Sequence, residues 1–448
     1  MKEFDVFVIG SGMAGMTVAK KCASEGLSVG ITDERPYGGT CALRGCDPKK
    51  VLTGVTEVFR SAQNLQHKGL EGIPSLNWKD LMRFKSTFTD SMPGKIEKDY
   101  KDHGIITFHS QAKFLDPNTI ELNETRVKAK KIILATGARP RTLNIPGGEY
   151  TLTSTDFLNL KELPKSLLFI GGGYIAFEFA HIAARFGAKV TIVHRGEHPL
   201  AKFDHNIVKH LVSATEKLGI DIVLNTEVTE VQKSEKGFLV TVENKNGKNS
   251  YPVSAVFNSS GRVPAIDDLD LEKAGIAYNK KGIEVNDYLQ STSNTHIYSA
   301  GDSAVTNGLP LTPVAVLEGH VVASNVIGNN HKKMKYPAIP SVVFTLPPVA
   351  MVGMTEREAN DQDLSFETKY ESVPGWFNAK RTNQDEYAFK TLIDKESDRI
   401  LGAHLIGPHA EETINLFAMA MNADLKTHDL KKMLYSYPSM ASDISSMI

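Results

Sequence analysis

The chain has 448 residues and a formal net charge of −1, so it is long enough for roughly two to four domains. Its balanced charge excludes strong electrostatic attraction to nucleic acid or to an anionic membrane surface, and no apolar run is long enough to span a bilayer. Three cysteines are too few for a stabilising disulfide framework, so a pair five residues apart is typical of catalysis or metal binding. Residues 4–9 have the pattern of a buried strand rather than of a secretory signal, so we expect a cytoplasmic protein.

A strand, a glycine-rich turn, a helix and a second strand follow one another twice along the chain. The first copy has strands at residues 4–9 and 27–32 around the turn 10–15, and the second has strands at 166–170 and 188–193 around the turn 171–176. Strand-like segments that enter a glycine turn recur at 131–137, 255–261 and 297–302. This alternation predicts an α/β architecture with parallel sheets and two Rossmann-like dinucleotide-binding folds.

The first glycine turn has the spacing of a dinucleotide-binding motif, with Gly10, Gly12, Ala14 and Gly15. In such a turn the first glycine permits the tight bend, the second lets backbone amides approach a pyrophosphate, and the third permits close packing of the helix. Asp33 ends the following strand, where a carboxylate can accept hydrogen bonds from a ribose. An ordinary strand–helix turn is the alternative interpretation, which this context disfavours.

The second glycine turn differs from the first in its third glycine and in the charge that follows it. Its members are Gly171, Gly172, Gly173, Tyr174, Ile175 and Ala176, and the motif tolerates alanine at the third glycine position. The following strand ends with His194 and Arg195 and carries no carboxylate there. Because a cation can pair with a 2′-phosphate, we interpret this site as favouring NADPH over NADH, with Lys202 as a further cation. A solvated basic loop is the alternative interpretation.

Beyond residue 331 the glycine turns become sparse and the pattern changes. Residues 336–340 have the composition of a linker, residues 389–393 alternate in hydrophobicity, and residues 412–422 have helical spacing. We therefore expect an α+β domain at the end of the chain.

Cys41 and Cys46 directly follow the first nucleotide-binding unit. A pair of buried thiols packed as small hydrophobic groups is the alternative interpretation, which the flanking glycines and Pro48 disfavour. The pattern Gly-Gly-Thr-Cys, four residues, Cys, x-Pro-Lys resembles the signature of the pyridine-nucleotide disulfide oxidoreductases of the glutathione reductase and dihydrolipoamide dehydrogenase type. The resemblance extends along essentially the whole chain and includes Ala135-Thr136-Gly137, Gly173-Tyr174-Ile175 with Glu178, Gly261-Arg262-x-Pro264, Gly301-Asp302 and Leu311-Thr312-Pro313.

This resemblance implies two Rossmann-like FAD/NAD(P)-binding domains and a C-terminal α+β dimerisation domain. The FAD-binding domain would comprise residues 1–147 and 261–333, the NADPH-binding domain residues 148–260, and the dimerisation domain residues 334–448 of a homodimer. Beside the two glycine turns, Asp33, His194 and Arg195, the implied cofactor contacts are Gly39, Thr40, Lys49, Thr136, Gly137, Gly261, Arg262, Gly301, Asp302 and Thr312. Among them, the carboxylate of Asp302 would bond the ribityl chain of FAD.

The resemblance also implies a path for electrons. Hydride would pass from nicotinamide to flavin, and an electron pair from flavin to a Cys41–Cys46 disulfide, with Cys41 as the interchange thiol and Cys46 next to the flavin. Lys49 would pair with Glu178 near the reactive edge of the flavin, and Tyr174 would be the gate that moves aside for nicotinamide. No resident metal is implied.

The last segment departs from the pattern of the resembled reductases, which carry His-Pro-Thr followed shortly by Glu. Tyr437 replaces the histidine that would shuttle a proton across the dimer interface, and Ser442 stands where the glutamate would be, with Asp443 next to it. A phenol with a reference pKa of about 10 is a poor base at neutral pH but a serviceable acid. Tyr437 could therefore act as the acid, the substrate could need no strong base, or the ring could simply fill space.

Three other residues have weaker signals. Arg44 would lower a thiol pKa if it pointed inward; otherwise it would be an exposed cation or form a weak surface pair with Asp47. Cys22 lies on the packed side of the first helix pattern and is predicted to be inert core. Lys20 stands where glutathione reductases often carry an arginine, which is compatible with an anionic substrate.

Three functions follow from these observations. The leading hypothesis is an NADPH- and FAD-dependent reductase of a small disulfide, similar to glutathione reductase. The second is reduction of a metal ion or another electrophile at the same dithiol, because mercuric reductases resemble this chain in carrying a tyrosine near position 437, although they also carry a terminal cysteine pair that is absent here. The third is a flavin-based redox sensor, which the intact set of Lys49, Glu178 and Tyr174 disfavours.

Overall fold

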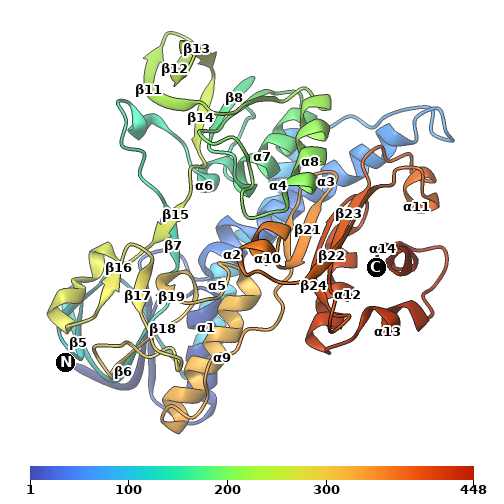
Figure 1. Ribbon diagram of the computed structural model, residues 1–448. Coiled ribbons are helices and arrows are strands. Elements are labelled where there is room, and N and C mark those ends of the chain that lie inside the picture. The colour runs from blue at the N-terminus through green and yellow to red at the C-terminus, as the bar shows by residue number, and fades with distance from the viewer. The chain divides into compact units, whose positions relative to one another are not determined.

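The computed structural model describes all 448 residues, which form two compact units, each assembled from three segments of the chain (Figure 1). The first unit consists of Met1–Lys49, Arg83–Arg141 and Arg262–Tyr336, and the second of Lys50–Met82, Thr142–Gly261 and Pro337–Ile448. Residues 50–82 therefore group with the second unit and not with the rest of the predicted segment 1–147.

The first unit is built on a seven-stranded sheet. Six of its strands follow the order β3-β2-β1-β6-β5-β4, and β18 also pairs with β6. The strands are β1 (Lys2–Ile9), β2 (Val29–Asp33), β3 (Ile106–His109), β4 (Ala112–Asp116), β5 (Thr119–Leu122), β6 (Thr125–Leu134) and β18 (Ile297–Ser299). The pairs β1–β2, β1–β6, β2–β3 and β18–β6 are parallel, whereas β4–β5 and β5–β6 are antiparallel. The predicted parallel core of the first nucleotide-binding unit is confirmed.

Helices α1 (Met13–Ser24) and α9 (Thr312–Gly328) lie side by side in this unit (Figure 1). Successive side chains of a strand point to opposite faces of a sheet, so Val6 and Val8 of β1 pack with α1 and α9 while Phe7 and Ile9 pack in the other core. Cys22 of α1 is fully buried in the first of these cores, as predicted. Burial raises the pKa of this thiol to about 12, so it stays protonated and unreactive.

Short elements complete the first unit. The helices are α2 (Gly39–Arg44), the first turn of α3 (Cys46–Asn64), the later part of α4 (Trp78–Thr89) and α5 (Met92–Asp102). The short strands are β7 (Ala138–Pro140), β15 (Arg262–Pro264), β16 (Tyr278–Asn279), β17 (Gly282–Glu284) and β19 (Ala304–Val305). Strand β15 pairs antiparallel with β7. The chain therefore leaves this unit after β7 and re-enters it at the strand that pairs with β7.

The second unit contains the second nucleotide-binding pattern. Its parallel sheet has the order β10-β9-β8-β14, with β8 (Ser166–Ile170), β9 (Lys189–Val193), β10 (Asp221–Val223) and β14 (Ala255–Asn258). Helices α6 (Ser154–Phe157), α7 (Tyr174–Arg185) and α8 (His205–Lys217) accompany it, and β11 (Glu227–Ser234), β12 (Gly237–Asn244) and β13 (Gly247–Val253) form a separate antiparallel sheet. The predicted strands 166–170 and 188–193 are thus confirmed to within one residue.

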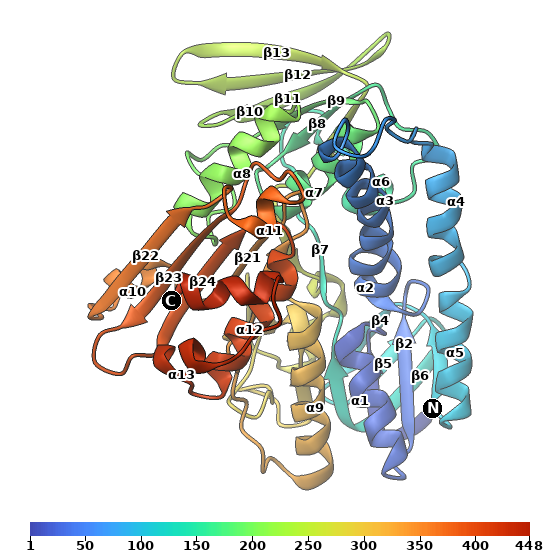
Figure 2. The same ribbon diagram turned by 90° about the vertical axis from the view of Figure 1, so that its right-hand side faces the viewer.

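A five-stranded antiparallel sheet forms the last part of the second unit, in the order β20-β21-β24-β23-β22. Its strands are β20 (Ser341–Val343), β21 (Val349–Gly353), β22 (Phe366–Ser372), β23 (Ala388–Asp394) and β24 (Ile400–Ile406), with α10 (Glu356–Asp361), α11 (Phe377–Lys380), α12 (Ala410–Asn422), α13 (Thr427–Lys432) and α14 (Ile444–Met447) (Figure 2). Alternation along the strands separates two cores: Ala388 and Ile406 pack with α8, whereas Phe389 and Leu405 pack with α12. The expected α+β end domain is confirmed.

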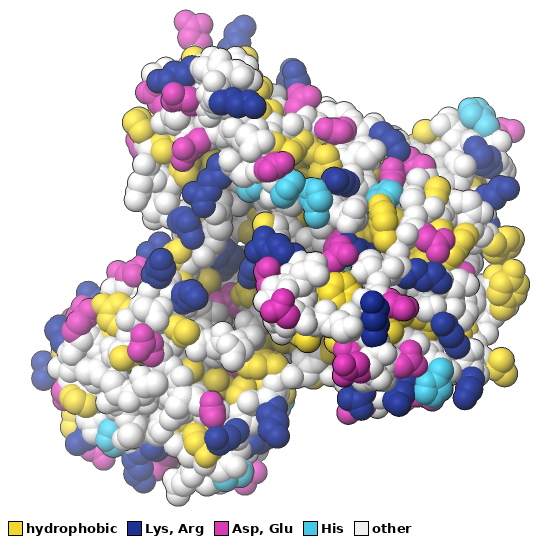
Figure 3. Space-filling model, in the orientation of Figure 1, with side chains coloured by type: hydrophobic (Ala, Val, Ile, Leu, Met, Phe, Trp, Pro, Cys, Tyr) yellow, Lys and Arg dark blue, Asp and Glu magenta, His cyan; other side chains and the backbone are white.

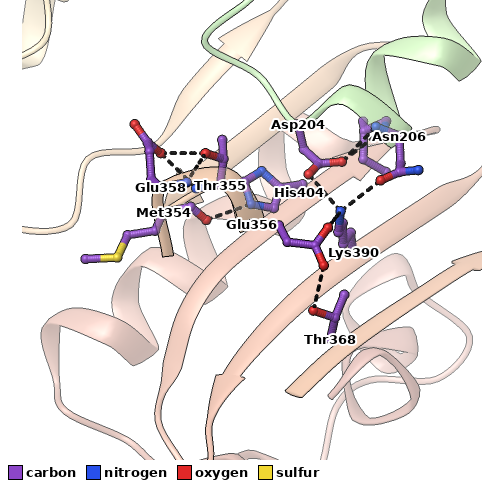
Figure 4. Close-up of polar contacts among 10 residues, drawn as sticks. Asp204, Asn206, Met354, Thr355, Glu356, Glu358, Thr368, Lys390 and His404 are labelled. Carbon is purple, nitrogen blue, oxygen red and sulfur yellow. Dashed lines mark hydrogen bonds and ion pairs between the residues drawn. The ribbon is translucent and has the colours of Figure 1, made fainter. Parts of the chain in front are cut away.

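A buried cluster of charged groups fastens α8 to this sheet (Figure 4). The Nζ of Lys390, on β23, donates to Asp204 Oδ2 at 3.0 Å, Asn206 Oδ1 at 2.8 Å and Glu356 Oε2 at 2.5 Å. Asp204 is also the N-cap of α8, accepting from the backbone N–H of Asn206 and Ile207. Because Asp204 is almost fully buried, it depends on the Lys390 ammonium for its counter-charge, whereas the buried ammonium is compensated by both Asp204 and Glu356.

The surface carries both signs of charge. Figure 3 shows Lys and Arg side chains interspersed with Asp and Glu over the visible face, in keeping with a net charge of −1. None of the helices combines the length and the apolar character that a membrane crossing requires.

Candidate active site

The first glycine turn is hydrogen-bonded to the end of β2 and to the start of α2. Ser11 donates to Asp33 Oδ2 from its backbone N–H at 2.8 Å and from its hydroxyl at 2.7 Å, and Gly38 N–H donates to the Ser11 hydroxyl at 3.2 Å. Gly10 has a φ of +103°, and a Cβ there would lie 2.3 Å from the carbonyl oxygen of Ala135, so only glycine fits. The carboxylate of Asp33 therefore fixes the turn to the end of β2 through its two hydrogen bonds with Ser11.

The turn leaves space and unpaired polar atoms where FAD is expected. A Cβ built on Gly12 or Gly137 meets no atom within 4 Å, and the buried Thr136 hydroxyl has no hydrogen-bond partner in the polypeptide. Burial raises the pKa of Asp302, and the nearby Arg262 guanidinium opposes that rise. An open cradle, an orphaned hydroxyl and a partly desolvated carboxylate fit a dinucleotide that brings phosphate and hydroxyl groups.

Glu318 supports the turn that carries Asp302, and the sequence reasoning missed it. Its carboxylate accepts from the Gly301 N–H at 2.6 Å, the Thr306 hydroxyl at 2.9 Å and the Tyr336 hydroxyl at 2.5 Å. Glu318 is buried on α9, and burial raises the pKa of its carboxyl. A single acidic residue within the apolar stretch 313–323 was the signal that could have identified it, because a buried charge requires partners.

The two active-site cysteines lie on consecutive helices separated by Gly45. Cys41 is on α2 and Cys46 is the first residue of α3, and their side chains share a hydrogen bond. The sulfur of Cys46 lies 3.4 Å from the Thr312 hydroxyl, and that of Cys41 lies 3.9 Å from a carboxylate oxygen of Asp47. The structure thus brings together the two cysteines and Thr312, which the resemblance named as site residues.

These contacts make the two thiols unequal. The hydrogen bond from Cys41, assisted by Thr312 and the Lys49 ammonium, lowers the pKa of Cys46 to about 6, against the opposing effects of burial and Asp47. The same hydrogen bond, together with burial, raises the pKa of Cys41. At neutral pH the reduced pair therefore consists of a Cys46 thiolate and a Cys41 thiol that donates to it.

Arg44 is a partly buried residue at the end of α2. Burial lowers the pKa of Arg44, and the charged groups that act on that pKa are Arg35, Asp33, Arg262 and Glu34. Its Nε is buried and unpaired, and it forms no ion pair with Asp47. Arg44 is therefore neither fully exposed nor paired with Asp47, and an effect of its charge on a thiol stays a prediction.

The second unit holds the other predicted redox-site residues. Gly171 has a φ of +110°, and a Cβ there would lie 2.6 Å from the Ser259 carbonyl oxygen, which explains the glycine. Tyr174 begins α7 with its side chain exposed, and Glu178, one turn further on, is buried and accepts from the Phe344 N–H at 2.8 Å. Lys49 belongs to the first unit, so its predicted pairing with Glu178 stays a prediction.

At the end of the second glycine unit, His194 and Arg195 point to different surroundings. The His194 ring accepts from the Gly172 N–H, whereas Arg195 and Lys202 are exposed. Gly261, with a φ of +132°, closes the strand pattern that starts at β14. Arg195 is therefore the cation that remains available at the end of β9.

Tyr437 is an exposed residue of the last segment. Its side chain is 79% exposed and its ring stacks on that of Phe377 with centroids 6.5 Å apart, so it does not fill space within the chain. Asp443 accepts instead from Asn378 and from the Tyr387 hydroxyl at 2.9 Å, and Ser442 bonds the Ser439 carbonyl. Neither of the residues near the expected glutamate position therefore holds Tyr437.

Comparisons with known proteins agree with this arrangement. The family model for pyridine nucleotide-disulphide oxidoreductases matches residues 4–319, and the model for the dimerisation domain of the same enzymes matches residues 339–448. The chain is 34% identical to a glutathione reductase of Burkholderia cepacia over 99% of its length and 98% of that protein, and 30% identical to a mercuric reductase of Staphylococcus aureus over 99% of its length and 81% of that protein. Its fold matches the Cu(II) complex of the HOCl-induced flavoprotein disulfide reductase RclA from Escherichia coli with a TM-score of 0.88 and 29% identity, covering 100% of this chain and 99% of that one.

Proposed function

Because the chain belongs to the pyridine nucleotide-disulphide oxidoreductase family, we propose that it reduces a small disulfide at the Cys41–Cys46 pair. It is an NAD(P)H-dependent flavoprotein oxidoreductase, and its cofactors are FAD and NADPH. Bound FAD supplies a two-electron relay between the nicotinamide and the dithiol. The observation that carries the proposal is the hydrogen-bonded pair in which Cys46 has a pKa of about 6 and Cys41 keeps its proton.

The unequal thiols support a division of labour in disulfide exchange. Cys41 attacks one sulfur of the substrate as its proton passes to the Cys46 thiolate, and the substrate S–S bond breaks to release one thiolate. Cys46 then loses that proton and attacks the Cys41 sulfur of the mixed disulfide, which releases the second thiolate and forms the Cys41–Cys46 disulfide. The two released thiolates take up two protons. In this scheme Cys46 replaces the missing histidine as the base for the first step.

The proposed roles of the remaining residues follow the family pattern. Lys49 would stabilise negative charge beside the thiolate, with Glu178 compensating the lysine, and Tyr174 would gate the nicotinamide. Tyr437 would protonate the leaving thiolate from the partner subunit of a homodimer. A cytoplasmic location would keep such a working dithiol in a reducing compartment.

Exposed apolar side chains support the homodimer. They lie within residues 377–437 of the dimerisation domain: Phe377, Leu416, Met419, Met433, Leu434 and Tyr437. An isolated subunit would expose these side chains to water, whereas an isologous interface would bury them on both copies. We therefore propose that this face forms the interface of the homodimer.

The charge near Lys20 argues against a strong preference for glutathione disulfide. Its Nζ lies 2.8 Å from a carboxylate oxygen of Asp99, so the lysine is already neutralised. An anionic substrate would gain little net attraction there, because an exposed ion pair has weak long-range influence. The proposal is therefore a small disulfide of unspecified charge.

A metal ion is the second candidate substrate. Mercuric reductases are 30–31% identical to this chain over 99% of its length, and the structural neighbour from Escherichia coli is described as a Cu(II) complex. Tyr437 supports this candidate, because a metal ion that binds two thiolates leaves no thiol to be protonated. Two Cu(II) ions would accept one electron each as the Cys41 thiol and the Cys46 thiolate form a disulfide and the one proton of the pair leaves.

One experiment separates the two substrates. Purified enzyme is reduced with NADPH without oxygen, and the flavin spectrum is followed as glutathione disulfide, other small disulfides, Cu(II) and Hg(II) are added in turn. The first proposal predicts rapid reoxidation by a disulfide, and reoxidation by metal ions alone would favour the second. The Cys41→Ser variant should bind FAD but lose disulfide turnover, and a variant that retains turnover would refute the assigned role.

A further inference from the structure

The imidazole of His194 faces the second glycine turn. Its Nδ1 accepts a hydrogen bond from the Gly172 N–H at 3.1 Å, and its Nε2 donates to the carbonyl oxygen of His198 at 3.2 Å. A Cβ built on Gly172 would lie 2.8 Å from the ring, and one built on Gly196 would lie 3.0 Å from it. The ring is thus packed between two glycines that have no side chains to displace it.

The loop that follows β9 also holds the other side of Gly172. The Leu200 N–H donates to the Gly172 carbonyl oxygen at 2.9 Å, so both backbone groups of this glycine are bonded by residues 194–200. The loop itself is anchored, because Thr226 N–H donates to the His194 carbonyl at 3.0 Å and Asn225 N–H to that of Gly196 at 3.1 Å. Gly172 is the second glycine of the turn, the one that lets the backbone approach a pyrophosphate.

The hydrogen bonds define the protonation state of this ring. A nitrogen that accepts an N–H carries no proton, so His194 is the neutral tautomer with its proton on Nε2. Burial lowers its pKa, and the adjacent Arg195 lowers it further. In the same loop, Glu197 and His198 are the other titratable groups; the glycine turn contributes only the Tyr174 phenol, and residues 224–226 contribute none.

We propose that His194 is a positioning residue that fixes the glycine turn for NADPH and does not contact the 2′-phosphate, which leaves that contact to the cation already predicted at Arg195. The neutral ring offers no charge to a phosphate, and its two nitrogens are already used within the protein. Arg195 is exposed at the end of β9 and forms no hydrogen bond or ion pair within the chain. The basic pair at residues 194 and 195 therefore divides into a structural ring and a recognition cation.

This division has a consequence for pH dependence. Protonation of His194 turns Nδ1 into a donor, which sets it against the Gly172 N–H and releases the turn. Cofactor binding should therefore weaken as the pH falls through the pKa of this imidazole, for cofactors with and without a 2′-phosphate. A histidine that only contacted the 2′-phosphate would behave in the opposite way, because its protonation would strengthen the binding of NADP⁺.

The first test measures the dissociation constants of NADP⁺ and NAD⁺ with the oxidised FAD-bound enzyme between pH 5 and 8. His194→Gln is the informative variant, because an amide can accept from Gly172 and donate to His198 but does not titrate. The dissociation constant of NAD⁺ should rise about tenfold at the acid end in the wild-type enzyme, because one hydrogen bond is lost and the turn is released. In the variant this constant should not change with pH. Equal pH dependence in the two proteins would overturn the proposal.

The second test compares the two side chains at pH 8. His194→Leu should weaken NADP⁺ and NAD⁺ by a similar factor, about tenfold, whereas Arg195→Gln should weaken NADP⁺ by about 10- to 100-fold and leave NAD⁺ unchanged. A His194→Leu protein that lost only NADP⁺ binding would show that His194 contacts the 2′-phosphate, and the proposal would be wrong. If this variant does not fold, His194→Gln decides the question. The inference rests on NADPH as the cofactor and not on the substrate, so failure of the disulfide assignment leaves these measurements interpretable.

Discussion

Replacing Cys41 by alanine should raise the pKa of the Cys46 thiol by about one pH unit or more. The thiol of Cys41 is the largest cause that lowers this pKa, ahead of Thr312 and Lys49. A hydrogen bond to a charged group stabilises it by about 1.5–3 kcal/mol, and each pH unit corresponds to about 1.36 kcal/mol, which gives about one to two pH units. Cys46 is partly desolvated by its neighbours but remains accessible to solvent, which weakens the hydrogen bond, so the lower half of that range applies and the pKa should move from about 6 to about 7.

The assay is the pH dependence of alkylation of the reduced protein by iodoacetamide, read as the modified fraction of each peptide. Trypsin cleaves after Arg44, so Cys41 and Cys46 fall in different peptides and are counted separately. At pH 7 the thiolate fraction of Cys46 should fall from about nine-tenths to about one half in Cys41→Ala, since only the thiolate reacts. Buried Cys22 serves as the unreactive internal control.

Thr312→Val provides the matched comparison, because its hydroxyl contacts the same sulfur at 3.4 Å but ranks below Cys41 as a cause. Its effect should be in the same direction and smaller. A Cys46 pKa that is unchanged in Cys41→Ala, or that rises more in Thr312→Val, would refute the assignment of the Cys41 hydrogen bond as the main cause.

Three further predictions concern the supports of the site. Glu318→Gln should weaken FAD binding about tenfold, because an amide cannot accept from Gly301, Thr306 and Tyr336 together; FAD release on dialysis measures this, and unchanged retention would contradict the role. Lys390→Met should destabilise the second unit by about 3–5 kcal/mol by leaving Asp204 buried without a cation, seen as a lower melting temperature that adding Asp204→Asn partly restores. Tyr437→Phe should slow disulfide turnover but not Cu(II) reduction. A variant that turns over the disulfide at the wild-type rate at every pH would exclude the hydroxyl as the acid.

Much of the fold could be predicted from the sequence because its signals are local. The strand at residues 166–170, the turn that follows it and the helix after that turn are specified by neighbouring residues, and each was found within one or two residues of its predicted place. The glycines at 10 and 171 mark backbone angles that other residues rarely adopt, which is a property of single positions. The spacing of Cys41 and Cys46 likewise identifies a working dithiol without reference to the rest of the chain.

The properties of the site depend on residues that only folding brings together. Which cysteine carries the negative charge is decided in part by Thr312, which is 266 positions away from Cys46 in the sequence. The direction of the His194 ring and the burial of Glu318 are also set by packing, because a hydrogen bond needs its partner at about 3 Å and no sequence spacing specifies that distance. The sequence alone therefore determined that this protein binds two dinucleotides and carries a dithiol. The tertiary structure decided which thiol ionises and which of two basic residues is free to meet a phosphate, because pKa and hydrogen bonding depend on distances in space.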